Sequence, residues 1–187
     1  MILDYKDIDD LNRYKIMSGT VVPRPIAWIV TKDEGIVNAA PFSYFIPLSS
    51  NPATIIVSIG KKDADTPKDT LANILKNKKA TICFANEANL EELKLSSTAL
   101  AKSESEIEKY SIKVTKILED FPPMISSSQS ALFCTLHSSI NLGGDTTPVI
   151  LEIKKQFIKD ECINEKLHVS MKNIGRIGVS FAKMVSI

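Results

Sequence analysis

A short segment near residue 42 combines residue types that suit a flat ligand. Phe42, Tyr44 and Phe45 place three aromatic rings around the hydroxyl of Ser43. Pro41 has no N–H to donate, so we expect it to end the pairing of the preceding strand and leave the following amides free. Ring faces and free amides bind planar ligands. Composition alone favours the simpler interpretation, a β-turn whose rings pack in the core.

A second group of residues suits a phosphate. Asp69 is the predicted N-cap of a helix over 70–77, with Lys68 and Thr70 beside it. A helix N-terminus presents unpaired N–H groups and a partial positive charge, which together favour an anion. The alternative is a solvated surface, because this stretch is rich in lysine and aspartate. The residues expected on the buried side of the helix are Leu71, Ile74 and Leu75.

The strand expected over 53–60 has two different faces. Ala53, Ile55, Val57 and Ile59 alternate with Thr54, Ile56, Ser58 and Gly60. The second face is small and hydroxylated. A strand that served only to fill the core would not require such a face.

The order of these segments carries a family resemblance. The chain resembles the flavin reductase-like, FMN-binding family, which includes flavin reductases and flavoredoxin. The resemblance covers most of the chain, through RPIAWIVT (24–31), NAAPFSYF (38–45), SSNPATIIVSIG (49–60), KDTLANI (68–74), GGDTTPVILEI (143–153) and NIGRIGVSF (173–181).

The resemblance implies a fold and a cofactor. It implies a mostly β chain with short helices, folded as an antiparallel split β-barrel that dimerises and holds FMN noncovalently near the subunit interface. Asn38, Pro41 and the segment 43–45 would then approach the isoalloxazine ring, with Tyr44 against it. The candidates for the ribityl and phosphate end are Ser58, Gly60, Lys68, Asp69, Thr70 and Asn73.

Three other residues that could contact a cofactor have weaker assignments. His137 is a flavin candidate on an expected strand, although a lone strand histidine is more often a hydrogen-bonded core or interface residue. Arg24 and Arg176 fit either an ion pair or a cofactor contact. No catalytic residue is expected, because flavin chemistry needs from the protein only binding, orientation and electrostatic tuning.

Bulk properties exclude several classes of protein. The chain has 187 residues and a net charge of +1, which predicts one domain over 1–187 and no nucleic-acid partner. Its polar N-terminus and the lack of a long apolar run predict a cytoplasmic protein outside membranes. Its three cysteines have no metal-site spacing and are expected to be buried thiols. Nucleotide-loop, HExxH and GxSxG motifs are absent.

Hydrophobic patterning predicts an antiparallel sheet, because long crossover helices between successive strands are missing. Residues 1–17 are expected to be a polar lead-in with a helical turn, and 167–187 have no assignment. Apolar residues on both faces of 26–31 indicate that a second subunit covers one of them. The expected strands are 26–31, 36–40, 53–60, 79–85, 112–117, 131–141 and 148–157, with a helix over 89–95 and helix-compatible sequence over 99–110.

The function expected is transfer of electrons from NAD(P)H through bound FMN to free flavin, a ferric chelate or a protein acceptor. Two alternatives stay open. One is a flavoredoxin-like electron carrier with no NAD(P)H oxidase activity of its own, and the other is a non-redox ligand-binding module on the same fold. No motif in the sequence distinguishes NADH from NADPH.

Overall fold

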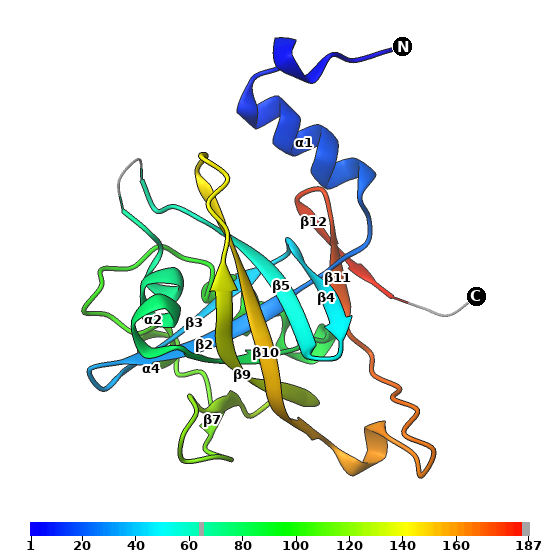
Figure 1. Cartoon of the computed structure of the whole chain (residues 1–187). Coiled ribbons are helices and arrows are strands. Elements are labelled where there is room, and N and C mark those ends of the chain that lie inside the picture. The colour runs from blue at the N-terminus through cyan, green and yellow to red at the C-terminus, as the bar shows by residue number, and fades with distance from the viewer. Residues whose placement is uncertain (64–65, 185–187) are drawn as a thin grey trace.

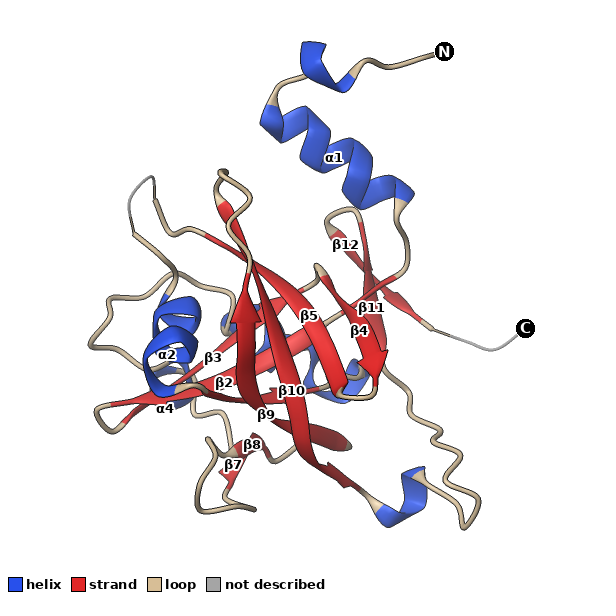
Figure 2. Cartoon of the chain, viewed as in Figure 1, coloured by secondary structure: helices blue, strands red, loops and turns tan. Residues whose placement is uncertain are grey.

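The computed structural model describes residues 1–63 and 66–184 and is dominated by one curled antiparallel sheet (Figures 1 and 2). The strand order is β3-β2-β6-β9-β10-β5-β4, and short β-ladders pair β1 with β11, β11 with β12, and β7 with β8. The strands are β1 (Arg24–Pro25), β2 (Ala27–Asp33), β3 (Ile36–Phe42), β4 (Phe45–Ser50), β5 (Ala53–Gly60), β6 (Lys79–Cys83), β7 (Val114–Thr115), β8 (Met124–Ile125), β9 (Ser130–Ser139), β10 (Thr146–Ile158), β11 (Ile174–Ile177) and β12 (Ser180–Lys183).

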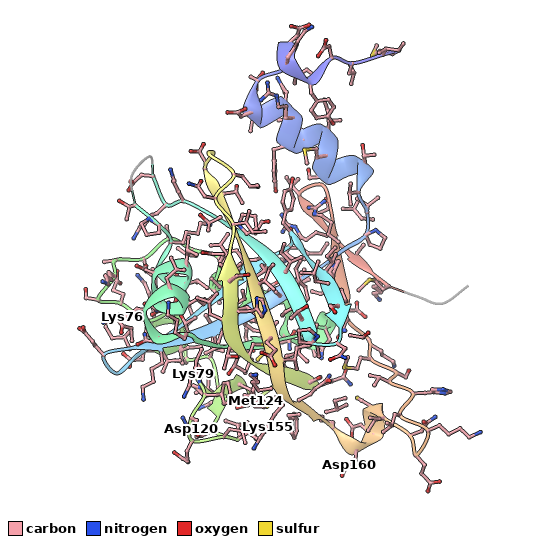
Figure 3. All side chains as sticks on the ribbon, viewed as in Figure 1. Lys76, Lys79, Asp120, Met124, Lys155 and Asp160 are labelled. Atoms are coloured by element: carbon pink, nitrogen blue, oxygen red, sulfur yellow. The ribbon has the colours of Figure 1, made fainter. Side chains whose placement is uncertain are left out.

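The helices are short and lie around the sheet. They are α1 (Asp10–Thr20), α2 (Asp69–Asn77), α3 (Leu90–Leu95) and α4 (Glu106–Lys109), with 3₁₀ turns at Tyr5–Asp7, Glu87–Asn89 and Asp160–Cys162. Lys76 of α2 bonds Asp33 at 2.8 Å and Glu34 at 3.0 Å, which fixes this helix against the tip of the β2–β3 hairpin (Figure 3).

The first hairpin forms as expected, but its second arm is longer. Glu34 and Gly35 have φ angles of 48° and 91°, so both central residues of the turn are left-handed, as a tight hairpin requires. Pro41 does not end the ladder: it faces Trp28 across the strands, and Phe42 faces Ala27. The proline is tolerated because β3 is an edge strand of this sheet. The expected free segment is therefore limited to Ser43 and Tyr44, because Phe42 ends β3 and Phe45 begins β4.

Strand β2 is covered on both faces by the chain itself. Ala27 and Ile29 belong to a core enclosed by the curled sheet, while Trp28 and Val30 belong to a second core between the sheet and the segments that follow β6. Trp28 to Val30 have no exposed surface. The apolar character of both strand faces thus has an intramolecular cause, and it is wrong as an indication of a second subunit.

Several boundaries differ from those expected. The lead-in contains an eleven-residue helix, α1, which the side chain of Asp9 caps by accepting from the Asn12 N–H at 2.9 Å. Residues 99–110 hold only the four-residue α4, and the strand expected over 112–117 shortens to β7. The unassigned C-terminal stretch supplies β11 and β12. The last residues of that expected range, 185–187, lie outside the described part.

Two leucines on the β9–β10 hairpin provide a test of the core. Leu151 is fully buried in the enclosed core, whereas Leu142 in the connecting turn is 67% exposed. Leu151→Ala is expected to lower the free energy of unfolding by about 2–5 kcal/mol, because it removes buried surface and leaves a cavity. Leu142→Ala is expected to stay within about 0.5 kcal/mol. Urea unfolding measures both, and equal effects would contradict this account of the core.

Candidate functional site

Three adjoining cavities lie along β3 and the segment that follows it. We call them the helix-end cavity, about 90 Å³ beside the start of α2, the central cavity, about 230 Å³, and the apolar cavity, about 310 Å³ beside α1 and β4. Ser97 lines the first two, and Ser43 lines the second and third. The chain therefore passes from one cavity to the next between Asn38 and Phe45. Most of the sequence-predicted residues line this row.

The helix-end cavity has the features of an anion site. Lys68 is the N-cap residue of α2 and makes no side-chain cap, so the first amides of the helix have no capping side chain. Its ammonium lies 5.6 Å from the ring centroid of Phe42, and it has no ion pair within the described ranges. Asp69 is the first helical residue rather than the cap, which corrects the prediction. Its carboxylate lies 4.0 Å from Lys62 Nζ.

Two predicted contact residues have structural partners instead of free polar groups. Asn38 is buried, and its Nδ2 donates to Glu106 Oε2 and to the Glu104 carbonyl, both at 3.1 Å. Asn73 Nδ2 donates to Thr31 Oγ1 at 3.1 Å. These amides therefore hold α4 and α2 against the sheet. Thr70 is also buried, and Leu75, expected on the buried side of α2, is 36% exposed.

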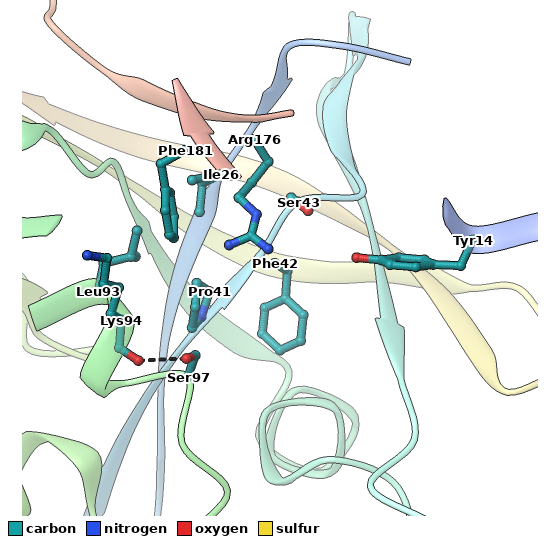
Figure 4. A pocket seen from close by; sticks show the side chains of 10 residues that line it. All are labelled: Tyr14, Ile26, Pro41, Phe42, Ser43, Leu93, Lys94, Ser97, Arg176 and Phe181. Atoms are coloured by element: carbon teal, nitrogen blue, oxygen red, sulfur yellow. Dashed lines mark hydrogen bonds between the residues drawn. The ribbon is translucent and has the colours of Figure 1, made fainter. Parts of the chain in front are cut away.

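The central cavity is lined by rings, hydroxyls and a guanidinium (Figure 4). Pro41, Phe42 and Ser43 form one side, and Arg176 and Phe181 reach it from β11 and β12. The Ser43 hydroxyl accepts from Arg24 Nε at 3.5 Å. Arg24 also donates to the carbonyl oxygens of Ser18 and Gly178, so it ties the chain segments around the cavity together and serves the fold.

The apolar cavity contains Tyr44 and Ser58. The Tyr44 ring stacks on Tyr14 of α1 at 6.1 Å between centroids, and burial, followed by the nearby Tyr14 phenol, raises the pKa of Tyr44. Ser58 N–H donates to the Tyr44 carbonyl at 2.8 Å. Only Ser43 and Tyr44 lie between strands, because Phe45 already begins β4 and is buried against Phe84. Phe45 is thus chiefly a core residue.

Three predicted residues stand apart from the row: His137, Gly60 and Asn73, the last of which lines a further cavity of about 320 Å³ beside the tip of the β2–β3 hairpin. His137 lies at a β-bulge, between pairs formed by Leu136 and Ser138 with β10, and its ring is exposed. Its Nδ1 is 3.2 Å from Ser138 Oγ. Gly60 pairs with Thr146, and a Cβ at this position would meet only a carbonyl 3.9 Å away. The bulge interrupts the regular alternation of strand faces at His137.

Several lining residues were not predicted. The segment after α3, residues 96–100, closes the helix-end cavity, and Tyr14 closes the central one. Ser96-Ser97-Thr98 has turn composition and follows a short helix, which is a signal for a loop but not for its position. Only long-range packing brings this loop opposite β3.

The cysteine thiols lie in the interior of the protein. Desolvation raises the pKa of Cys83 and of Cys134 to about 12, so both stay protonated near neutral pH. All three cysteines are buried and free, as expected. Residues 1–63 and 66–184 contain no group of three metal-ligating side chains. In the same ranges, no helix is long and apolar enough to cross a membrane.

Comparison with known proteins identifies the family. The sequence profile of the flavin reductase like domain matches residues 17–172. An uncharacterized protein of Halalkalibacterium halodurans is 36% identical over 140 residues, which are 73% of this chain and 67% of that protein. The chain therefore belongs to the flavin reductase-like family, as its motif order indicated.

Solved structures confirm the fold. Nitrilotriacetate monooxygenase component B from Bacillus cereus aligns with a TM-score of 0.93 at 24% identity, covering 100% of this chain and 96% of that one. A protein of Shewanella frigidimarina, described as a flavin reductase with a split barrel domain, aligns with a TM-score of 0.87 at 19% identity and covers 100% and 96% of the two chains. The predicted antiparallel split β-barrel is confirmed, and the family supports a flavin-related oxidoreductase role.

The Glu106 carboxylate provides a first test of how the site is held. It accepts from Asn38 Nδ2 and from the Ala39 N–H at 3.2 Å. Glu106→Ala removes the acceptor of the Ala39 N–H and leaves Asn38 Nδ2 only the Glu104 carbonyl, which is expected to lower the free energy of unfolding by about 1–3 kcal/mol. Glu106→Gln retains one acceptor oxygen and is expected to lose less. Equal losses of stability for the two variants in chemical unfolding experiments would show that the acceptor oxygen of residue 106 does not contribute to stability.

The buried thiols give a second test. Because Cys83 and Cys134 are fully buried with raised pKa values, neither is expected to react with a thiol-specific disulfide reagent in the native protein at pH 8. Both are expected to react after unfolding in guanidinium. Mass spectrometry of labelled peptides identifies the sites, and rapid native labelling of Cys83 would contradict the burial described.

Proposed function

We propose that this protein is an FMN-binding oxidoreductase that passes electrons from NAD(P)H, through bound flavin, to free flavin, a ferric chelate or a protein acceptor. The observation that carries the proposal is the row of cavities, with a cationic helix start at one end and an aromatic, hydroxyl-bearing segment at the other. A flavin mononucleotide has the same polarity, an anionic phosphate on one end and a flat ring on the other. The cationic helix start and the aromatic, hydroxyl-bearing segment therefore suit the two ends of FMN.

Each residue has a role in this proposal. Lys68, Thr70 and the first N–H groups of α2 would hold the phosphate. Pro41, Ser43 and Tyr44 would position the ring. Ser58, a sequence candidate for the ribityl and phosphate end, lines the apolar cavity with Tyr44 and would instead lie at the ring end. The raised pKa of Tyr44 keeps its phenol neutral, so it would add no negative charge beside the ring. FMN supplies hydride and electron transfer when bound, and the side chains supply binding, orientation and exclusion of water.

We also propose a cytoplasmic homodimer. α1 buries only Ser18 among its residues and leaves Leu11, Tyr14 and Met17 at least 40% exposed. Ile46 and Leu48 are about half exposed on the edge strand β4. Met17 and Ile46 line the apolar cavity, and Tyr14 stacks on Tyr44, which also lines it. A second copy that covers this exposed surface would therefore also enclose the ring end of the site. Free, buried cysteines suit a reducing compartment.

The visible spectrum of the purified protein tests the proposed function directly. A yellow protein that releases its flavin on acid precipitation is expected, followed by NADH or NADPH oxidation that depends on FMN. Retention of colour in the precipitate would contradict noncovalent binding. Bound FMN without NAD(P)H oxidation would favour the flavoredoxin-like carrier, and a colourless protein that refuses FMN would favour a non-redox module.

The phosphate end can be tested by comparing two flavins. Lys68→Ala is expected to weaken FMN binding about 10-fold or more and to leave riboflavin binding nearly unchanged, because riboflavin has no phosphate. Adding Thr70→Ala is expected to enlarge the loss. Lys155→Ala, an exposed lysine on β10 (Figure 3), is the matched control and is expected to change neither affinity. Equal losses for FMN and riboflavin would place Lys68 away from the phosphate.

Dimerisation and flavin binding are expected to be linked. If a second copy encloses the ring end, saturating FMN stabilises the dimer by mass action. Sedimentation velocity at low protein concentration, with and without FMN, measures this shift. A monomer–dimer equilibrium that ignores saturating FMN, or a monomer that binds FMN with full affinity, would contradict the coupling.

A further inference from the structure

A separate cavity of about 210 Å³ lies where the end of β2 and the start of β6 meet the segment that precedes β8. Its walls include three lysines from three different segments, Lys32, Lys79 and Lys116, and the turn over 119–122. Figure 3 labels Lys79 and, in that turn, Asp120. None of its lining residues lines the three cavities of the row, so the proposed flavin seat assigns it no role. We call it the lysine cavity.

Two of the lysines face each other across neighbouring strands. The ladder of β2 and β6 pairs Val30 with Thr81, and the same register continued by two residues sets Lys32 opposite Lys79. Residues two positions apart along a strand share a face, so both side chains lie on one side of the sheet, where they line the same cavity. Like charges directly opposite each other in an antiparallel pair are destabilising.

No carboxylate relieves this repulsion in the described part of the chain. The Lys32 side chain has no hydrogen bond or ion pair there, and the Lys79 ammonium has only the Phe121 ring, 5.5 Å from its centroid. The Lys116 ammonium donates to the carbonyl oxygens of Glu119 and Phe121 at 2.9 and 2.8 Å. Carbonyl oxygens accept hydrogen bonds but carry no net charge, so the positive charges of all three lysines remain in one cavity.

Two carboxylates line the lysine cavity without neutralising these lysines. Glu119 and Asp120 are exposed, and neither forms an ion pair with any other residue that the structure describes. Solvent screens exposed charges, whereas Lys79 is half-buried at the start of a strand. The carboxylates therefore lower the positive potential of the cavity, but they leave the space between the two strand lysines without a counter-ion from the chain.

The walls of the lysine cavity are held by the chain itself. Asn77 Nδ2 donates to the Lys32 carbonyl at 3.1 Å, which fixes the end of α2 against β2. Thr81 Oγ1 donates to the Pro122 carbonyl at 2.6 Å, which fixes the turn over 119–122 against β6. The cavity is thus a preformed recess, and its volume suits a small anion rather than a nucleotide.

We propose that the lysine cavity binds the phosphate group of a small phosphate monoester, with the ammonium groups of Lys32 and Lys79 on either side of the phosphate. A phosphate monoester carries nearly two negative charges near neutral pH, which matches the two strand lysines, and its terminal oxygens accept N–H bonds. Lysine binds phosphate as a point charge with rotatable donors, so the site needs no planar fork. This site is distinct from the phosphate seat at Lys68 and does not depend on the proposed function.

Glycerol 3-phosphate tests the proposal on the full chain. Backbone amide NMR shifts report the two phosphate sites separately, and the expected result is saturable shifts at residues 32, 77 and 79 that persist in Lys68→Ala. Sodium chloride at the same ionic strength and glycerol are the controls, and neither is expected to reproduce these shifts. Shifts confined to residues 68–70 would support the flavin phosphate seat and overturn the present proposal, as would equal shifts with chloride.

Variants locate the charge. Lys32→Gln and Lys79→Gln are each expected to weaken glycerol 3-phosphate binding about 10-fold, because each removes one charge-assisted contact. Lys166→Gln, at an exposed lysine before β11, is the matched control for net charge and is expected to bind normally. Without ligand, Lys32→Gln is expected not to lower the midpoint of thermal unfolding, because it removes the repulsion between strands. Equal affinities in the three variants would overturn the proposal.

Asp120→Asn tests the sign of the ligand charge. This variant removes a negative charge from the lysine cavity, so it is expected to tighten glycerol 3-phosphate binding about 2-fold. A site that held a zwitterion, with its anionic group on the lysines and its ammonium on the turn, would instead lose affinity in the same variant. Weaker binding in Asp120→Asn, together with saturable binding of the zwitterion β-alanine at residues 32 and 79, would overturn the phosphate assignment.

Discussion

Burial of β2 on both of its faces is the constraint on which the positions of the candidate residues depend. Ala27 and Ile29 fill the enclosed core, while Trp28 and Val30 fill the outer one, and both cores come from the same chain. A strand with no exposed face cannot slip by one residue, because a slip would exchange every side chain between the two cores. The register of β3 follows from β2, and β3 carries the floor of the cavities.

The outer core also determines which segments line the cavities opposite β3. Its members include Leu93 and Ile107, which bring α3 and α4 against the sheet opposite β3. Glu106 then accepts from Asn38 and Ala39, and the loop after α3 comes to lie beside Lys68. The cavities are thus a consequence of how the second half of the chain packs on the first hairpin.

The C-terminal strands add the last element of the site. Gly175 lies with its Cα so close to β1 that a Cβ would meet the Arg24 carbonyl at 2.9 Å, which explains the glycine at this position. This close pairing holds β11 against β1 and brings Arg176 over the central cavity. The same segment had no assignable structure by pattern, because its partner strand is only two residues long.

The sequence by itself determined the strand content, the first hairpin, the helix after β5 and the family, because local alternation, turn residues and the order of motifs are properties of the chain. It also determined the cation at the start of α2. Tertiary structure decided the rest: that Pro41 pairs on an edge strand, that Asn38 and Asn73 are engaged with Glu106 and Thr31, and that a bulge exposes His137. It alone placed Arg176 with Pro41, since residues 135 positions apart meet only through long-range packing, which no local pattern encodes.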